Sequence, residues 1–242
     1  MFTKVQIVGI LVFVVLGTAV TTNAANLVTN PGFETYENTS GGPSGSYGDW
    51  NGDYSAIVDA TSGVTPMSGS KMLQFKGTSH VGYAYSNACH IFQVINISDY
   101  HCLIAAGQGI AQASMYLNRI SGDSQTDTQF NLHLMAFDGT NDTFPSRWES
   151  YTYSASIGHN YVTLQTDSSP ESWQICSVSL HLPVDTTFVV LAISANEDIY
   201  NDYSSTEFDG HFADNAFVQI VPEQATMLLL GLGVLAVRRK QI

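Results

Sequence analysis

The sequence predicts an all-β fold, a β-sandwich or jelly roll, and three observations support this prediction. Short segments alternate apolar and polar residues with a period of two, which is typical of strands with one buried face. Turn residues separate these segments, and no sustained helical period occurs between Asn26 and Val221. Eight or nine short strands in about 196 residues are enough to form two packed sheets around a sizeable core.

The clearest strand signals come from three segments. His90–Ile97 alternates, with Phe92 and Val94 on one face. Trp173–Leu182 places apolar side chains on one face and hydroxyls on the other, whereas Thr186–Ala195 is apolar on both faces, as expected of a central strand. The other predicted strands are Tyr54–Val58, Lys71–Phe75, Val81–Tyr85, Gly109–Ile120, Phe130–Phe137 and Phe212–Val221.

Two stretches are predicted to be loops. Glu37–Gly48 is rich in Gly, Ser, Asn and Thr, which favour turns over regular strands. Gly139–Ser172 is a long stretch between two predicted strands. Long loops on a rigid scaffold often carry binding residues, so this second stretch is a candidate binding region.

Composition and charge exclude several classes of protein. The chain is 44% hydrophobic and 11% aromatic, which excludes a disordered chain. It has 21 acidic and 8 basic residues, and this balance argues against nucleic acid, whose phosphates need clustered Lys and Arg. Residues 26–221 hold twenty of the acidic and four of the basic residues, a net charge of about −16. Such a domain repels anionic surfaces and offers carboxylates to divalent cations.

The N-terminus, residues 1–25, is predicted to be a secretory signal peptide. Lys4 supplies the positive charge, an apolar stretch follows from Val5 to Val20, and small residues up to Ala25 suit cleavage by signal peptidase after Ala24 or Ala25. A short membrane anchor is the alternative, but the apolar stretch is short and turn-rich sequence follows at once.

The C-terminus carries a short apolar run with a basic end. Ala225–Val237 is about 13 residues long, roughly 20 Å as a helix, and a comfortable membrane span needs about 20 residues. Arg238, Arg239 and Lys240 follow as a cytoplasmic stop. The tail therefore predicts transient membrane association and resembles tails that are removed during anchoring.

Residues 222–242 resemble the PEP-CTERM sorting signal of Gram-negative-type bacteria. The resemblance lies in Pro222 and Glu223, the apolar core and the basic end; Gln224 stands where that signal usually has a second proline. It implies processing by an exosortase near Pro222, export across the inner membrane, and delivery to the cell surface or extracellular matrix. Proteins with this signal are associated with exopolysaccharide and biofilm.

The region between the two ends resembles the carbohydrate-binding-module type of galactose-binding-like jelly roll. Four segments carry the resemblance: Asn26–Glu34, Met67–Leu73, Phe92–Val94 and Phe212–Ala216, with Asn215 where a second Asp is usual.

That resemblance implies a structural Ca²⁺ near the first and last strands. Glu34 and Asp214 would supply carboxylates, and Gly32 and the neighbourhood of Lys71 would supply backbone carbonyls. Calcium takes six to eight oxygen ligands, so this donor set suits it. The alternative is that Glu34 accepts hydrogen bonds from a turn and Asp214 caps a strand.

Aromatic residues offer candidate contacts for a sugar, because sugar C–H faces stack on rings while the hydroxyls pair with polar side chains. One predicted cluster is Trp50 and Tyr54, and a second is Trp148, Tyr151 and Tyr153. For Trp50 the competing interpretation is a core residue. Tyr83 and Tyr85 share one face of a predicted strand and offer a further contact surface.

The sequence gives little support to catalysis. It contains neither a His-Glu-x-x-His motif nor a nucleophile elbow, and its seven histidines are scattered. Asp138, Glu149 and Glu171 are candidates for a glycosidase pair, but any acidic protein offers such pairs. We therefore expect no enzymatic activity.

Cys89, Cys102 and Cys176 are the only cysteines, so three pairings are open and one thiol remains free. Export permits a disulfide, but Cys176 shares a strand face with apolar residues and is expected to be a buried thiol. There is no Cys-x-x-Cys pair, which argues against zinc.

Together these observations predict an exported, surface-sorted protein that binds polysaccharide without cleaving it. The expected partners are a matrix glycan, signal peptidase and an exosortase. Two alternatives stay open: a purely structural surface protein without a glycan pocket, and a small polysaccharide-active enzyme.

Overall fold

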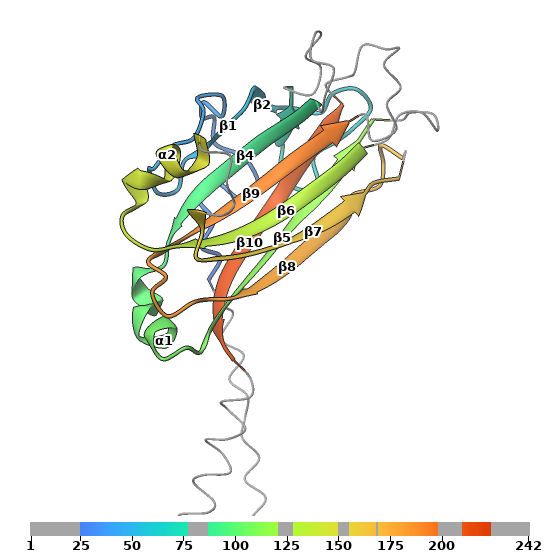
Figure 1. The fold of residues 1–242 in the computed structure, drawn as a ribbon. Coiled ribbons are helices and arrows are strands. Elements are labelled where there is room, and N and C mark those ends of the chain that lie inside the picture. The colour runs from blue at the N-terminus through green and yellow to red at the C-terminus, as the bar shows by residue number, and fades with distance from the viewer. Residues whose placement is uncertain are drawn as a thin grey trace, which may run out of the picture.

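The computed structural model describes residues 25–76, 87–120, 128–149, 155–167, 169–197 and 210–223. These residues form two five-stranded sheets, and every pair of neighbouring strands is antiparallel. Figure 1 shows the sheets as two layers of a sandwich, with the helices at the periphery. The predicted jelly-roll β-sandwich is therefore confirmed.

Each sheet mixes strands from both halves of the chain, as a jelly roll requires. Sheet A has the order β1-β4-β9-β6-β7: Trp50–Gly52, Asn87–Asn96, Phe188–Glu197, Thr128–Phe137 and Gly158–Gln165. Sheet B has the order β2-β3-β10-β5-β8: Ser55–Val58, Met72–Phe75, His211–Pro222, Gly109–Arg119 and Gln174–His181. The helices are short: α1 is His101–Ala105, α2 is Phe144–Glu149, and single 3₁₀ turns precede them at Ser98–Tyr100 and Asn141–Thr143.

Eight of the nine predicted strands correspond to strands of the structure within a few residues, and the ninth, Val81–Tyr85, lies outside the described residues. The prediction that Gly139–Ser172 is a loop was wrong, because α2 and the edge strand β7 fall within it. β7 has a neighbour on one side only and buries little; its inward residues are only partly buried. Its apolar alternation is correspondingly weak in the sequence.

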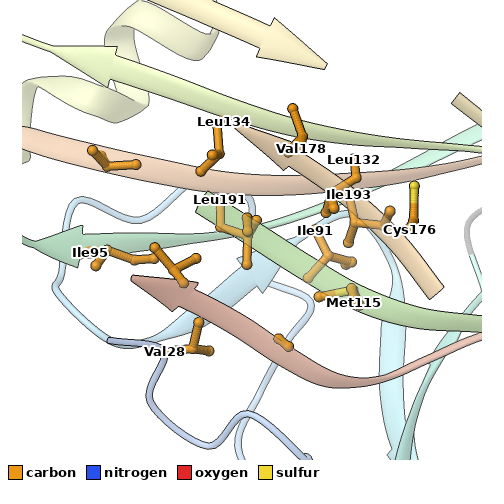
Figure 2. Packing of buried hydrophobic residues seen from close by; sticks show 14 of the residues in the cluster. Val28, Ile91, Ile95, Met115, Leu132, Leu134, Cys176, Val178, Leu191 and Ile193 are labelled. Carbon is orange, nitrogen blue, oxygen red and sulfur yellow. The ribbon is translucent and has the colours of Figure 1, made fainter. Parts of the chain in front are cut away.

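Alternate residues of the strands meet between the sheets and form one apolar core. Figure 2 shows this packing: Ile91 and Ile95 of β4 and Leu191 of β9 face Met115 of β5. Each such side chain contributes about 1.5–3 kcal/mol when fully buried. Cys176 of β8 belongs to the same cluster, and burial raises the pKa of its thiol to about 11.

No disulfide joins Cys89, Cys102 and Cys176 in the structure; Cys89 and Cys176 are buried and Cys102 is exposed. The predicted signal peptide and all of the sorting signal beyond Glu223 lie outside the described residues. Within the described ranges, no helix has both the length and the apolar character needed to cross a membrane.

Candidate functional site

The outer face of sheet A carries two adjacent rows of side chains that cross four strands. Because side chains alternate along each strand, residues paired between neighbouring strands share a face. One row consists of Phe92, Ala192, His133 and Tyr161. The next row consists of His90, Ser194, Asn131 and Thr163.

Three rings on β6 and β7 lie nearly parallel to one another on this face. The ring centroids of His133 lie 5.3 Å from those of both His159 and Tyr161, with planes tilted by 11° and 22°. His133 Nδ1 and His159 Nε2 are 3.0 Å apart, within hydrogen-bond distance. His133 is only 6% exposed whereas Tyr161 is 56% exposed, so the tyrosine presents the stack to solvent. We call these three residues the ring platform.

Both imidazoles of the ring platform are neutral at neutral pH. Burial, together with the nearby imidazoles of His159 and His90, lowers the pKa of His133 to about 4. Burial also lowers the pKa of His159. A neutral imidazole has one donor and one acceptor nitrogen, which suits the contact between the two rings. The platform is therefore an uncharged aromatic surface.

The neighbouring polar row is held in place by its own hydrogen bonds. Thr163 Oγ1 donates to Asn131 Oδ1 at 2.7 Å, and Asn131 Nδ2 donates to Ser194 Oγ at 3.3 Å. At the far end of the row, Asp53 Oδ2 accepts the backbone N–H of His90 at 2.8 Å and lies 3.2 Å from His90 Nδ1. The row thus offers fixed amide and hydroxyl groups beside the rings.

Trp148 lies where the covered part of this face meets its open part. Helix α2 packs Phe144 onto an apolar cluster of sheet A that includes Phe92 and Phe137. The indole of Trp148 is partly buried, 4.9 Å from the ring of Phe92 and 5.5 Å edge-on from that of His90. The predicted contact residue Trp148 therefore borders the polar row.

The other predicted aromatic contacts are distributed differently. Tyr151 and Tyr153 lie outside the described residues, as do Tyr83 and Tyr85. Tyr54 is 61% exposed and follows Asp53 between β1 and β2, and no contact between its ring and the ring platform is seen among the described residues.

The prediction that Trp50 contacts sugar was wrong, because its side chain is completely buried. Its ring packs 5.1 Å from that of Phe33, and its Nε1 donates to the carbonyls of Thr29 and Asn30 at 3.1 and 3.3 Å. Trp50 instead fastens the N-terminal segment to sheet A. A ring that solvent cannot reach has no free face for a ligand.

The predicted calcium residues come together at one end of sheet B. The Glu34 carboxylate accepts the backbone N–H groups of Ser70 and Lys71 at 2.9 and 3.1 Å and the Ser70 hydroxyl at 2.9 Å. These hydrogen bonds, led by the Ser70 N–H, lower the pKa of Glu34. Lys71 directs its ammonium group away to Asp59, at 2.7 Å.

Asp214 lies in the same place and is fully buried. Its carboxylate accepts the N–H groups of Ser68 at 3.1 Å and Asn215 at 2.7 Å. Burial, with a smaller contribution from the negative charge of Glu34, raises its pKa to about 6 in spite of these hydrogen bonds, which lower it. A Cβ atom on Gly32 would lie 3.6 Å from Asp214 Oδ1, so the Gly32 backbone closely approaches this carboxylate.

Four backbone positions around these carboxylates adopt left-handed conformations: Asn30, Phe33, Gly69 and Asn215. Such conformations are costly for residues other than glycine and often cluster at functional sites. No three His, Cys, Asp or Glu side chains in the described part of the chain lie close enough to hold a metal by themselves. A cation here would therefore need backbone carbonyls as well as the two carboxylates.

Of the predicted sorting motif, only the first two residues are described. Pro222 ends β10, and the Glu223 N–H donates to the Gln108 carbonyl at 2.8 Å. The Glu223 carboxylate lies 3.6 Å from His181 Nε2. Arg238, Arg239 and Lys240 lie outside the described residues.

The ring platform is the part of the site that the sequence prediction missed. His133 and His159 are 26 positions apart, and only the pairing of β6 with β7 brings them together. The available signal was the spacing of His159 and Tyr161, which share a face if β7 is a strand.

No family model matches this chain, and no curated protein matches it. Among solved structures, TmCBM61 in complex with β-1,4-galactotriose is 16% identical with a TM-score of 0.46, and the match covers 83% of this chain and 100% of that chain. The CBM22-1 xylan-binding domain of Xyn10C from Paenibacillus barcinonensis is 10% identical with a TM-score of 0.46, covering 82% and 96%. The Family 16 Carbohydrate Binding Module-2 is 10% identical with a TM-score of 0.35, covering 68% and 84%. These likenesses are too distant to assign a ligand or a role to any residue of this chain.

Proposed function

We propose that this protein binds a neutral glycan on the outer face of sheet A and does not cleave it. The observation that carries the proposal is the ring platform beside the fixed polar row. The exposed ring of Tyr161 can stack on the C–H face of a sugar, and the amide of Asn131 and the hydroxyl of Thr163 can pair with its hydroxyls.

Charge determines which kind of glycan fits. The chain has a net charge of −13 and repels polyanions, so an acidic polysaccharide is disfavoured. None of the residues that β4, β9, β6 and β7 contribute to the two rows is an Asp, Glu, Lys or Arg. Glycoside hydrolysis ordinarily needs two carboxyl groups flanking the bond, and these rows contribute none.

We further propose that Glu34, Asp214 and the carbonyls of Gly32 and Lys71 bind Ca²⁺. The chemistry of the donor set supports this, because burial disfavours the charge of the Asp214 carboxylate and the nearby charge of Glu34 adds to that effect. A divalent cation would neutralise both. It would also join the N-terminal segment, the turn at residues 67–71 and β10, so its role would be structural.

The sorting part of the proposal rests on the sequence of the two ends. The chain would be exported through its signal peptide, processed by an exosortase near Pro222, and displayed at the cell surface or in the extracellular matrix. The glycan partner would then be a matrix polysaccharide. The rival is a structural surface protein with no glycan site.

Native electrophoresis through gels that contain neutral polysaccharides tests the glycan proposal. We expect retardation of the protein by at least one polysaccharide, with the affinity reduced about tenfold in Tyr161→Ala. Tyr36→Ala removes a tyrosine that is 81% exposed on the N-terminal segment and is the matched control. A folded protein that no polysaccharide retards would instead support the structural alternative.

A further inference from the structure

The outer face of sheet B carries an open groove of about 370 Å³ over the three neighbouring strands β10, β5 and β8. Outward side chains of these strands line it: Gln112, Ser114, Ser177, Ser179, Phe217 and Gln219. The groove lies on the opposite side of the sandwich from the ring platform, because the two sheets turn their outer faces away from each other.

The groove is built from two cross-strand rows. Strand register places Phe217 beside Ser114 and Ser114 beside Ser177 in one row. In the second row Gln219 lies beside Gln112, and Gln112 beside Ser179. The Gln219 side-chain amide donates to Gln112 Oε1 at 2.6 Å, which fixes both amides over the floor of the groove.

An irregularity of β10 keeps Phe217 in this groove. Between Asp214 and Phe217 the chain advances by three residues, whereas its partner β5 advances by only two, from Tyr116 to Ser114. The extra residue is a β-bulge, and it lets Phe217 share the outer face with Asp214 while Ala216 enters the core. The bulge thus supplies the one aromatic ring among the residues that line the groove.

The lining chemistry selects a class of ligand. None of the six lining side chains is charged, although the chain as a whole is strongly acidic. A phosphate or carboxylate ligand would need cationic donors, and a metal would need carboxylates or imidazoles. Hydroxyls, paired amides and one partly exposed ring are what a neutral, polyhydroxylated ligand needs, because it offers both hydroxyls and apolar C–H faces.

We propose that this groove is a second binding site for a neutral glycan, independent of the ring platform. The proposal for the groove depends only on the geometry of sheet B. If the proposed function of sheet A also holds, one protein molecule would cross-link two polysaccharide chains. Two sites on opposite faces cannot follow one short glycan segment, so they hold separate segments.

The test uses retardation in native gels and turbidity of mixtures, with xylan, β-1,4-galactan, galactomannan and β-glucan as probes. Phe217→Ala and Gln112→Ala disable the groove, Tyr161→Ala disables the ring platform, and Gln165→Ala, on the exposed edge strand β7, is the control. Circular dichroism and the melting temperature of each variant establish that it is folded. When each groove substitution is added to the Tyr161→Ala protein, we expect the affinity measured by retardation to fall about tenfold. Each groove substitution alone should abolish the turbidity that the wild-type protein produces with long polysaccharide chains.

The outcomes separate the two proposals. If Tyr161→Ala alone removes all retardation and the groove variants change nothing, the groove inference is overturned and the proposed function stands. If the groove variants alone remove retardation, the groove is supported and the sheet A proposal fails. Absence of retardation of the folded wild-type protein on every probe overturns both.

Discussion

Replacing His211, the first residue of β10, should flatten the dependence of stability on pH. Its imidazole is fully buried, edge-on to Phe130 with the ring centroids 5.8 Å apart. Burial, together with the positive charge of Arg119, lowers its pKa to about 3. At pH 5 the folded protein therefore holds His211 neutral, whereas the unfolded chain, with an ordinary histidine pKa of about 6.5, protonates it.

The magnitude follows from this difference in bound protons. Because the folded pKa lies below the unfolded one, the stabilisation is complete above about pH 6.5 and is lost as the pH falls below it. Between pH 7 and pH 5 the unfolded state gains about 1.5 pKa units of protonation free energy, which is about 2 kcal/mol per histidine. The folded protein gains almost none from His211, since its pKa is about 3. His133, with a pKa of about 4, adds a similar dependence, while Asp214, with its pKa raised to about 6, opposes it.

Urea unfolding of wild-type and His211→Gln proteins at pH 7, 6 and 5 measures this directly. Any constant cost of the substitution cancels when the free energies at pH 7 and pH 5 are subtracted, as do the contributions of other groups. We expect the pH 7 to pH 5 loss of His211→Gln to be about 2 kcal/mol smaller than that of wild type. His101→Gln removes an exposed histidine and is the control. If wild type and His211→Gln lose equal stability, the burial argument is wrong.

Three further predictions concern the N-terminal segment and the carboxylates. Calcium at ~10 mM should stabilise the protein by about 1.5–3 kcal/mol relative to chelator in thermal melts, and Asp214→Asn should abolish this difference; equal melts of the wild type would contradict the calcium proposal. Gly69→Ala should also abolish the stabilisation by calcium, because the new Cβ would collide with the Glu34 carboxylate. Gly69 has a φ of +64°, so the substitution also carries a backbone cost. Gly42→Ala is the matched control for that cost, because Gly42 has a φ of +74° and no atom would lie within 4 Å of the new Cβ. Trp50→Ala should cost about 3–5 kcal/mol in urea unfolding, and a loss below about 1 kcal/mol would show that its burial matters little.

The fold was largely predictable because one physical signal specifies it. Long strands with one buried face, such as β5 and β8, repeat apolar residues with period two, and that pattern survives in the sequence. The signal fails where burial is slight or the element is short. β7 buries little, β1 has only three residues, and α2 has six with a proline among them, too few for a helical period.

The candidate site divides in the same way. Glu34 and Asp214 were predicted because each sits in a short recognisable segment, and the structure brings those segments together. The ring platform was not predicted from the sequence, because its rings come together only through the pairing of β6 with β7. Trp50 illustrates a different limit: composition cannot tell a ring that stacks on a ligand from one that fills the core, and only burial decides.

The bulge in β10 has a consequence for how this strand can vary. Upstream of it, His211 and Ala213 point into the sandwich; downstream, Ala216, Val218 and Ile220 do. The side chains that point into the sandwich belong to odd-numbered residues before position 215 and to even-numbered residues after it. The strand therefore consists of two segments whose inward and outward positions alternate in opposite order. Asn215 is thus the residue whose deletion would leave both segments facing as they do now. A shortened, regular β10 would keep its core but lose the left-handed turn that aims Asp214 at Ser68. Among relatives of this protein, a one-residue gap at this point should therefore coincide with loss of the carboxylates that correspond to Glu34 and Asp214, whatever the length of the surrounding loops.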